Sequence, residues 1–229
     1  QILERVNEAE RSALGEYLHP KGQLVITAPL VFGRLHLLPI ICSFQQQYPD
    51  VKVRLVLGDK TFNLLEDHID VAIRIGDLPD SSLVATKVSV TRLITCASPI
   101  YLKKVAEPKK PEDLSSLDCI SVTGLGSADI LNFWSAGKKQ SVSINPKLTV
   151  NTAEAALEAA TSGFGICRLY SYQVEQAIQK GKLKRLLNKH EEKAVPISVV
   201  YSSNPPMPIK LRSFLDYSVP LLRKRMEDD

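Results

Sequence analysis

The chain has 229 residues, of which 44% are hydrophobic and 24% are charged. This length and composition are typical of a globular protein with one large domain or two lobes, and they exclude a fibrous or largely disordered chain. The 29 basic and 25 acidic residues leave a net charge of +4, a smaller basic excess than a dedicated nucleic-acid-binding domain usually carries. The longest apolar runs, 22–33 and 194–209, are too short to span a bilayer, so we expect no membrane partner.

The first segment, residues 1–19, predicts a helix. Ile2, Val6 and Ala9 recur at helical spacing among Glu and Arg residues, and His19–Gly22 ends the pattern. An ordinary first helix packed on the core is one interpretation. We favour the end of a longer linker helix, because no helix-start signal precedes it. The chain begins without Met, which suggests a natural start upstream, and no signal peptide is recognisable.

Strands and helices then alternate up to residue 75. The pattern predicts a strand at Gln23–Thr27, a helix at Pro29–Tyr48, and further strands at Val51–Leu57 and Asp70–Ile75. A short helix is expected from Gly58-Asp59 through Leu65. This βαβαβ order favours a parallel sheet covered by helices.

The rest of the chain continues the alternation and implies a second lobe. The elements expected are extended segments 83–90 and 92–97, a helix from Ser98 to about Val105, strands 119–122 and 147–150, a helix 152–162 ending at Gly163, a strand 164–168, a helix 171–179, strands 184–187 and 197–201, and a helix 208–226. The chain would cross between lobes near 90–98 and return near 190–196. The predicted fold is α/β, with two Rossmann-like lobes joined by crossover strands: lobe I comprises 20–92 and 196–229, and lobe II comprises 93–195.

The four cysteines are too widely spaced for a zinc site or a disulfide framework. We interpret Cys42, Cys96, Cys119 and Cys167 as reduced core thiols of a cytoplasmic protein. The histidines lack metal-ligand spacing, and the motifs of nucleotide-binding loops, zinc proteases and serine hydrolases are absent from the sequence. The sequence therefore predicts no metal, no cofactor, no catalytic residue and no enzyme.

Hydroxyl and amide side chains recur where a predicted strand gives way to a helix. They lie in Thr27-Ala28-Pro29, in Ser98-Pro99, and in Asn151-Thr152, where Asn151 and Glu154 fit a capping box. Helix N-termini at the carboxyl ends of parallel strands present N–H groups that suit anionic ligands. Each of these residues alone is explained as a helix cap, whereas the three sites together favour a ligand-binding cleft.

Three charged residues bear on this cleft. Arg74, at the end of the third strand, and Arg168, after Gly163-Phe-Gly165, could add positive charge for an anion. Asp59, an acidic residue, does not fit a site for an anion. It could cap the helix expected after Gly58, or it could accept a hydrogen bond from a ligand hydroxyl or amine.

Four sequence blocks together resemble the effector-binding region of LysR-type transcriptional regulators. They are residues 22–39, 44–51 (FQQQYPDV), 70–76 (DVAIRIG) and 159–166 (AATSGFGI), and the resemblance covers about residues 10–226. It implies a fold similar to type 2 periplasmic-binding proteins, with two lobes and a cleft. It also implies that residues 1–19 are the end of the family's linker helix, and that a DNA-reading winged helix-turn-helix would precede them.

The resemblance also implies which residues bind ligand and which bind a second copy. Family ligand contacts fall here at Thr27–Pro29, Gly58–Lys60 and Asn151-Thr152 with Arg168. Many members have Ser or Thr where this chain has Pro29 and Asp59, and a proline where it has Leu169-Tyr170. Helices matching 30–46 and 170–180 pair antiparallel between copies in the family, which makes Leu30, Phe32, Leu37 and Val174 candidate interface residues.

These observations predict a ligand-sensing regulatory domain that binds a small, anionic metabolite between its lobes. It would form a homo-oligomer, a dimer for this fragment and often a tetramer at full length, and would control the DNA-binding domain. The alternative is a solute-binding protein of a transport system with the same fold. The linker-like helix and the four unpaired cysteines count against that alternative.

Overall fold

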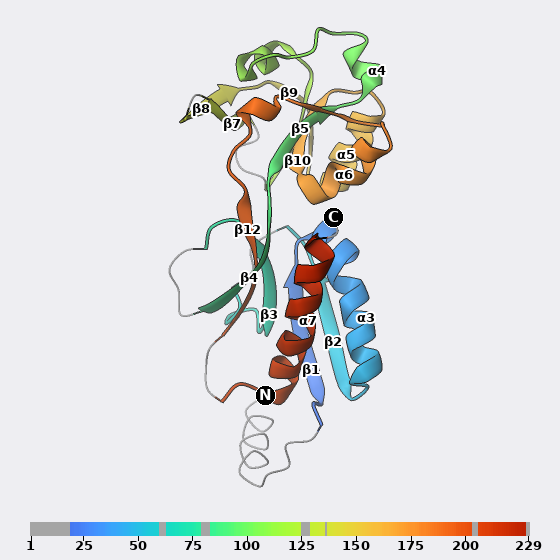
Figure 1. Cartoon of the computed structure of the whole chain (residues 1–229), viewed down its shortest axis with the longest axis vertical. Coiled ribbons are helices and arrows are strands. Elements are labelled where there is room, and N and C mark those ends of the chain that lie inside the picture. The colour runs from blue at the N-terminus through green and yellow to red at the C-terminus, as the bar shows by residue number, and fades with distance from the viewer. Residues whose placement is uncertain are drawn as a thin grey trace. The chain divides into compact units, whose positions relative to one another are not determined.

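The computed structural model describes residues 19–59, 63–78, 83–124, 129–135, 137–202 and 206–227. The linker helix expected over 1–19 lies outside these residues, apart from His19. Contacts divide the chain into two compact units (Figure 1): unit 1 runs to Ser89 and resumes at Pro196, and unit 2 is Val90–Val195. The lobes expected from sequence change at 92–93 and 195–196, whereas contacts change at 89–90 and 195–196.

Unit 1 contains a five-stranded sheet in the order β2-β1-β3-β12-β4. Its strands are β1 (Gly22–Ala28), β2 (Val51–Leu57), β3 (Val71–Ile75), β4 (Leu83–Thr91) and β12 (Val195–Ser202). β1 pairs in parallel with both β2 and β3, and β12 is antiparallel to β3. In β1, Leu24 and Ile26 are fully buried, which follows from the two-residue alternation of a strand.

The helices of unit 1 lie beside β1 and β2 (Figure 1). A continuous helical segment comprises α2 (Leu30–Phe32), the π-helical η1 (Gly33–Leu37) and α3 (Leu38–Gln47), and the chain closes with α7 (Ile209–Glu227). Phe44 of α3 packs edge-on against Phe214 of α7, with 5.2 Å between ring centroids. The two helices therefore share one apolar layer against the sheet.

The short helix expected through Leu65 is wrong for the residues that are described in that stretch, 63–69, which form turns. Asn63 and Asp67 bond to each other's backbone: the Asp67 carboxylate accepts from Asn63 N at 2.9 Å, and Asp67 N donates to Asn63 O at 2.9 Å. The backbone bond has the spacing of a single helical turn, whereas the side-chain bond to Asn63 N competes with extension of a helix. His68, with φ of 52°, then reverses the chain into Ile69 and β3.

Unit 2 contains a second five-stranded sheet in the order β11-β5-β10-β6-β9. Its strands are β5 (Leu93–Ala97), β6 (Cys119–Val122), β9 (Pro146–Val150), β10 (Ile166–Tyr170) and β11 (Lys184–Leu186). β6 is parallel to both β9 and β10. β5 is antiparallel to both β10 and β11, so it runs against the other long strands.

The remaining elements of unit 2 are helices and one hairpin. The helices are α4 (Pro99–Leu102), η2 (Pro111–Ser116), α5 (Ala153–Thr161), α6 (Ser171–Gln179) and η3 (Asn188–His190). The strands β7 (Ile130–Ser135) and β8 (Lys138–Ser143) form an antiparallel hairpin that the sequence analysis missed. Its residues Phe133 and Val142 share a core with Tyr101 and Leu114. The helix expected from Ser98 to about Val105 is shorter than predicted, because α4 ends at Leu102.

All four cysteines are free, but they are not all in the core. Cys96, Cys119 and Cys167 are buried, whereas Cys42 is exposed, so its assignment as a core thiol is wrong. Cys42 lies on α3, whose inward stripe is formed by Ile41 and Phe44. At 100° per residue, the position between them turns towards solvent.

Candidate ligand-binding site

The carboxyl ends of β1, β2 and β3 lie at one edge of the sheet of unit 1. The register pairs Ala28 with Leu57 and Thr27 with Ala72, which places Pro29, Asp59 and Arg74 at neighbouring positions. We call these positions, with Ala28 and Gly58, the carboxyl edge of unit 1. Lys60, also a candidate, lies outside the described residues. The parallel pairing thus brings together residues from three separate stretches of sequence.

Asp59 caps the helix that starts at this edge. Its Oδ1 accepts a hydrogen bond from the backbone N–H of Leu30 at 3.2 Å, and Gly58 N donates to Ala28 O at 3.1 Å. Pro29, the residue before the helix, makes no side-chain cap of its own. Asp59 therefore caps the helix that begins at Leu30, and its negative charge lies where the helix dipole favours it.

Two candidate residues of unit 1 have structural roles. The Thr27 hydroxyl donates to Val56 O at 2.9 Å across the β1–β2 pair, and the residue is 5% exposed. Ala28 is buried and contributes its carbonyl to the bond from Gly58. Among the other positions of this edge, Asp59 is exposed, and Pro29 and Arg74 are half-buried.

The carboxyl ends of β6, β9 and β10 form the corresponding edge of unit 2. Asn151 and Thr152 follow β9, and Tyr170 ends β10. The Thr152 hydroxyl caps α5 by accepting from Ala155 N at 3.3 Å. The capping box expected from Asn151 and Glu154 is wrong, because the helix starts one residue later. Asn151 is left exposed at the edge.

Ser98 does not belong to this edge, which corrects its assignment as a ligand residue beside Asn151 and Thr152. β5 runs antiparallel to β10, with Cys96 opposite Cys167, so the end of β5 lies at the other edge of the sheet. The Ser98 side chain is fully buried and caps α4 by accepting from Tyr101 N at 3.2 Å. The sequence pattern missed this because it cannot show strand direction.

Arg168 is a buried cation on β10. Only 8% of the residue is exposed, and its guanidinium lies 4.5 Å from the centroid of the Phe133 ring. It donates to Asn132 O and to Glu192 Oε2, the latter at 3.1 Å. Burial lowers the pKa of Arg168, and the carboxylate of Glu192 opposes that change. Because its charge is already paired with Glu192, Arg168 attracts an anionic ligand less strongly than an unpaired arginine would.

A pocket of about 210 Å³ lies beside this ion pair. It is lined by Leu93, Trp134, Tyr170, Glu192, Lys193 and Val195. The Lys193 ammonium lies 5.6 Å from the centroid of the Trp134 ring, and burial raises the pKa of the Tyr170 hydroxyl. The sequence analysis missed Trp134 and Glu192. The sequence signal that could have located the β7–β8 hairpin is Gly137, which lies between two short runs of alternating polar and apolar residues. In the structure Gly137 has φ of 80°, a conformation that hairpin turns require.

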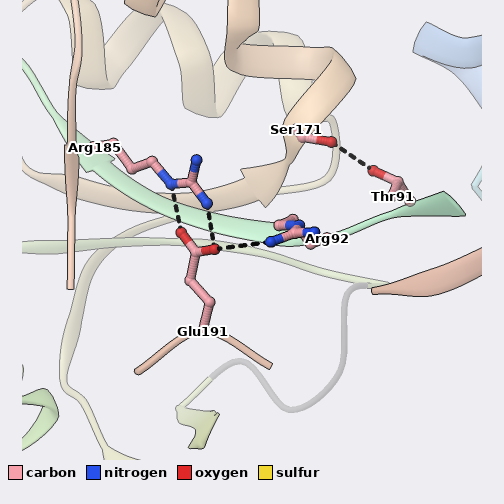
Figure 2. A network of polar contacts seen from close by, with 5 residues as sticks. All are labelled: Thr91, Arg92, Ser171, Arg185 and Glu191. Atoms are coloured by element: carbon pink, nitrogen blue, oxygen red, sulfur yellow. Dashed lines mark hydrogen bonds and ion pairs between the residues drawn. The ribbon is translucent and has the colours of Figure 1, made fainter. Parts of the chain in front are cut away.

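A polar network joins the segments where the chain enters and leaves unit 2 (Figure 2). Arg185 forms a two-point bond with Glu191, with Nε to Oε1 at 2.6 Å, and Arg92 Nη1 lies 4.0 Å from Glu191 Oε2. The bond to Glu191 raises the pKa of Arg185. Thr91 and Ser171 are linked through their hydroxyls at 3.0 Å. These bonds hold the entering segment, 91–92, against the start of α6, and they hold Glu191 of the leaving segment against Arg185 on β11.

Three of the four predicted interface residues are core residues of their own unit. Phe32, Leu37 and Val174 are fully buried, so their side chains have no surface to offer a second copy. Leu30 is half-buried and remains a candidate. On the same helical segment, Leu38 is 40% exposed and was not predicted. Periodicity located the helix but not which side faces the core.

The described residues contain neither a metal-binding cluster nor a helix that could span a membrane. Within 19–59, 63–78 and the other described ranges, no group of three His, Cys, Asp or Glu side chains could hold a metal ion. Across the same ranges, every helix is too short or too polar to cross a membrane.

Comparison with known proteins identifies the family. A family model described as the LysR substrate binding domain matches residues 19–222. The HTH-type transcriptional regulator CrgA of Neisseria meningitidis serogroup B is 34% identical over 225 residues, which cover 96% of this chain and 73% of that protein. The HTH-type transcriptional activator TtdR of Escherichia coli is 30% identical over 211 residues, covering 90% of this chain and 67% of that protein.

Solved structures agree in fold. The structure of CrgA from Neisseria meningitidis matches with a TM-score of 0.79 and 32% identity, over 96% of this chain and 75% of that one. The full-length Vibrio cholerae virulence activator AphB, at 23% identity, matches with a TM-score of 0.80 over the same shares, which shows the fold alone. These neighbours have the type 2 periplasmic-binding-protein-like fold expected from the sequence. The chain belongs to the LysR-type transcriptional regulators and contains their effector-binding, or substrate-binding, domain.

Proposed function

We propose that this chain senses a small metabolite through residues at the carboxyl edges of its sheets, and thereby regulates DNA binding by an N-terminal winged helix-turn-helix. The observation that supports the proposal is the strand register of unit 1, which gathers Pro29, Asp59 and Arg74 at one edge. Loops at the carboxyl ends of parallel strands are where ligands bind in open α/β sheets. This role places the protein in the cytoplasm, with the DNA.

The proposed ligand is anionic and also carries a hydrogen-bond donor. Arg74 brings positive charge to the edge of unit 1, whereas the exposed carboxylate of Asp59, which caps the helix at Leu30, suits a hydroxyl or amine of the same ligand. On unit 2, the exposed amide of Asn151 offers both a donor and an acceptor. A hydroxy acid or amino acid combines these features.

The proposed mechanism is a shift between two arrangements of the regulator. A ligand changes such an equilibrium only through its different affinity for the two arrangements, and a coupling of about 1–3 kcal/mol shifts it about 5–150-fold. Homo-oligomer formation through the helical segment 30–47 and α6 is part of the proposal. The relatives are transcriptional regulators, which favours this role over transport of a solute and over catalysis.

The proposal is tested by thermal unfolding of the purified chain with a panel of hydroxy acids, amino acids and dicarboxylates. A ligand at 100 times its Kd stabilises the fold by about 2.7 kcal/mol, enough to raise Tm by several degrees. The increase should shrink in Asn151→Ala and persist in Asn145→Ala, a matched exposed position outside the edge. An unchanged Tm across the panel, or an equal loss in both variants, contradicts the proposal.

A further inference from the structure

Unit 2 has a second and larger cavity, of about 530 Å³, whose lining shares no residue with the pocket beside Arg168. Two segments far apart in sequence line it, 107–109 and 184–190. Its volume lies within the range of about 300–1,000 Å³ that is usual for small-molecule sites. The cavity is therefore large enough for a metabolite and lies away from the carboxyl edge residues Asn151 and Thr152, which do not line it.

The lining of this cavity is strongly basic. It contains Lys109, Lys184, Arg185 and Lys189 against one carboxylate, Glu107. Glu107 is bonded to Lys184 at 2.6 Å, and Arg185 is paired with Glu191, which does not line the cavity. The backbone N–H of Lys109 donates to the Asp113 carboxylate at 2.9 Å, and this hydrogen bond lowers the pKa of Asp113. The excess of positive charge on a concave surface attracts an anion.

The wall formed by residues 187–190 has an unusual backbone and an unsatisfied polar group. Leu187 has φ of 55°, a left-handed conformation that is unfavourable for a residue with a branched side chain. His190 N donates to Leu187 O at 2.8 Å, which closes the turn. The Nδ1 atom of His190 is buried and has no hydrogen-bond partner among the described residues. Strained, unsatisfied segments of this kind cluster at ligand sites.

We infer that this cavity binds a small organic oxyanion, carrying phosphate or carboxylate groups, independently of the effector site proposed above. Lys109 and Lys189 hold the anion by charge, and the guanidinium of Arg185 has the planar geometry that pairs with an oxyanion at two points. Glu191 already occupies that guanidinium (Figure 2), so the bound anion competes with Glu191. Glu191 also lies within 4.0 Å of Arg92. Anion binding thus weakens the Arg185–Glu191 pair, which holds Glu191 beside Arg92.

The test is isothermal titration calorimetry of the whole chain at low salt with inorganic phosphate, adenosine monophosphate and citrate, and with adenosine as the neutral control. At least one anion should bind and adenosine should not. The Lys109→Gln/Lys189→Gln variant should weaken that binding about 3- to 20-fold, and Glu191→Gln should strengthen it by freeing Arg185. Lys103→Gln/Lys104→Gln removes the same charge from an exposed turn outside the cavity and should leave the affinity unchanged.

Each opposite result overturns the inference. One is the absence of binding by all three anions at a Kd below about 10 mM. A second is an equal loss of affinity in the two lysine double variants, which would show a general effect of net charge. A third is binding that is lost in Asn151→Ala but kept in Lys109→Gln/Lys189→Gln. That result would place the anion at the carboxyl edge, in agreement with the proposed function and against this cavity.

Discussion

The carboxylate of Asp59 caps a helix that begins 29 residues earlier, at Leu30, with 3.2 Å between Oδ1 and the backbone nitrogen. The bond exists because β1 and β2 are parallel neighbours, so the loop after β2 lies beside the start of the helix after β1. It places a negative charge at the helix N-terminus where an anionic ligand would otherwise be most favoured. Asp59 thus both stabilises the helix and limits the ligand chemistry of this edge.

We predict that Asp59→Ala lowers the free energy of unfolding by about 0.5–1 kcal/mol, the usual cost of losing an exposed cap. Asp59→Asn should cost less, because the amide oxygen still accepts from Leu30 N. Urea denaturation provides the measurement, with Asp77→Ala, an exposed acid near the end of β3, as the control. Equal effects of Asp59→Ala and Asp77→Ala would rule out a capping role.

Glu192→Gln should lower the free energy of unfolding by about 1–3 kcal/mol, because it leaves the buried Arg168 guanidinium without its carboxylate. The Glu192 side chain is 29% exposed, so we expect a smaller loss than the roughly 3–5 kcal/mol found when a fully buried pair is broken. Asp216→Asn serves as the control, since its pair with Arg212 is 3.9 Å long and about three-quarters exposed on both sides. Its loss should be within about 0.5 kcal/mol. A smaller loss in Glu192→Gln than in the control would contradict the prediction.

The thiol of Cys119 should make stability depend on alkaline pH. Burial, with a smaller effect of the nearby Asp118 carboxylate, raises its pKa from 9.0 to about 11. The unfolded chain therefore loses the proton at lower pH than the folded chain does. The resulting stability is fully present below pH 9 and is lost as the pH rises through 11, by roughly 2–3 kcal/mol in total.

The measurement is urea denaturation between pH 8 and 11 of the parent chain and of Cys119→Ala. Tyr101 and Cys167, whose pKa values are also raised by their surroundings, titrate in both proteins. Cys119 itself contributes to the raised pKa values of both groups, so the difference between the two pH profiles reports Cys119 together with its electrostatic coupling to Tyr101 and Cys167. Parallel profiles over this window would show that its pKa is not raised.

Gly165→Ala should destabilise the chain by about 1–3 kcal/mol or more through overpacking. A Cβ at this position would lie 2.5 Å from the backbone oxygen of Asp118, which accepts the hydrogen bond from Ile166 N that pairs β10 with β6. Gly181→Ala is the control, because its Cβ meets nothing within 4 Å and only its φ of 69° causes strain. Thermal unfolding should rank Gly165→Ala as the more damaging change, and the reverse order would refute the packing argument.

Leu38→Asp should dissociate the proposed oligomer. Leu38 is 40% exposed on α3, the element that we propose contacts α6 of a second copy, and a carboxylate buried there would lack a partner. Light scattering coupled to gel filtration at matched concentrations gives the mass. Leu65→Asp, which replaces a leucine that is 58% exposed in the 63–69 turns, should leave the mass unchanged. A parent chain that is monomeric at every concentration would refute the proposed interface.

Apart from the β7–β8 hairpin and the turns at 63–69, the sequence by itself determined the order of the described strands and α-helices, and it indicated the family. Alternation of apolar residues located β1, β2 and β3, and helical spacing with Pro29 and Tyr48-Pro49 as limits located the segment 30–47, because these patterns reflect local geometry. Four short blocks in a fixed order were enough to indicate the LysR-type effector-binding region. None of this required knowing which strands are neighbours.

Only the tertiary structure decided which of the candidate site residues lie close together. The antiparallel direction of β5 removes Ser98 from the edge that holds Asn151 and Thr152, although all three follow a strand. Tertiary packing buries Phe32 and Leu37, which periodicity could not distinguish from the exposed Leu38. Arg168 finds its carboxylate 24 residues away, at Glu192. Strand direction, burial and ion pairing depend on residues distant in sequence, and local patterns carry no information about them.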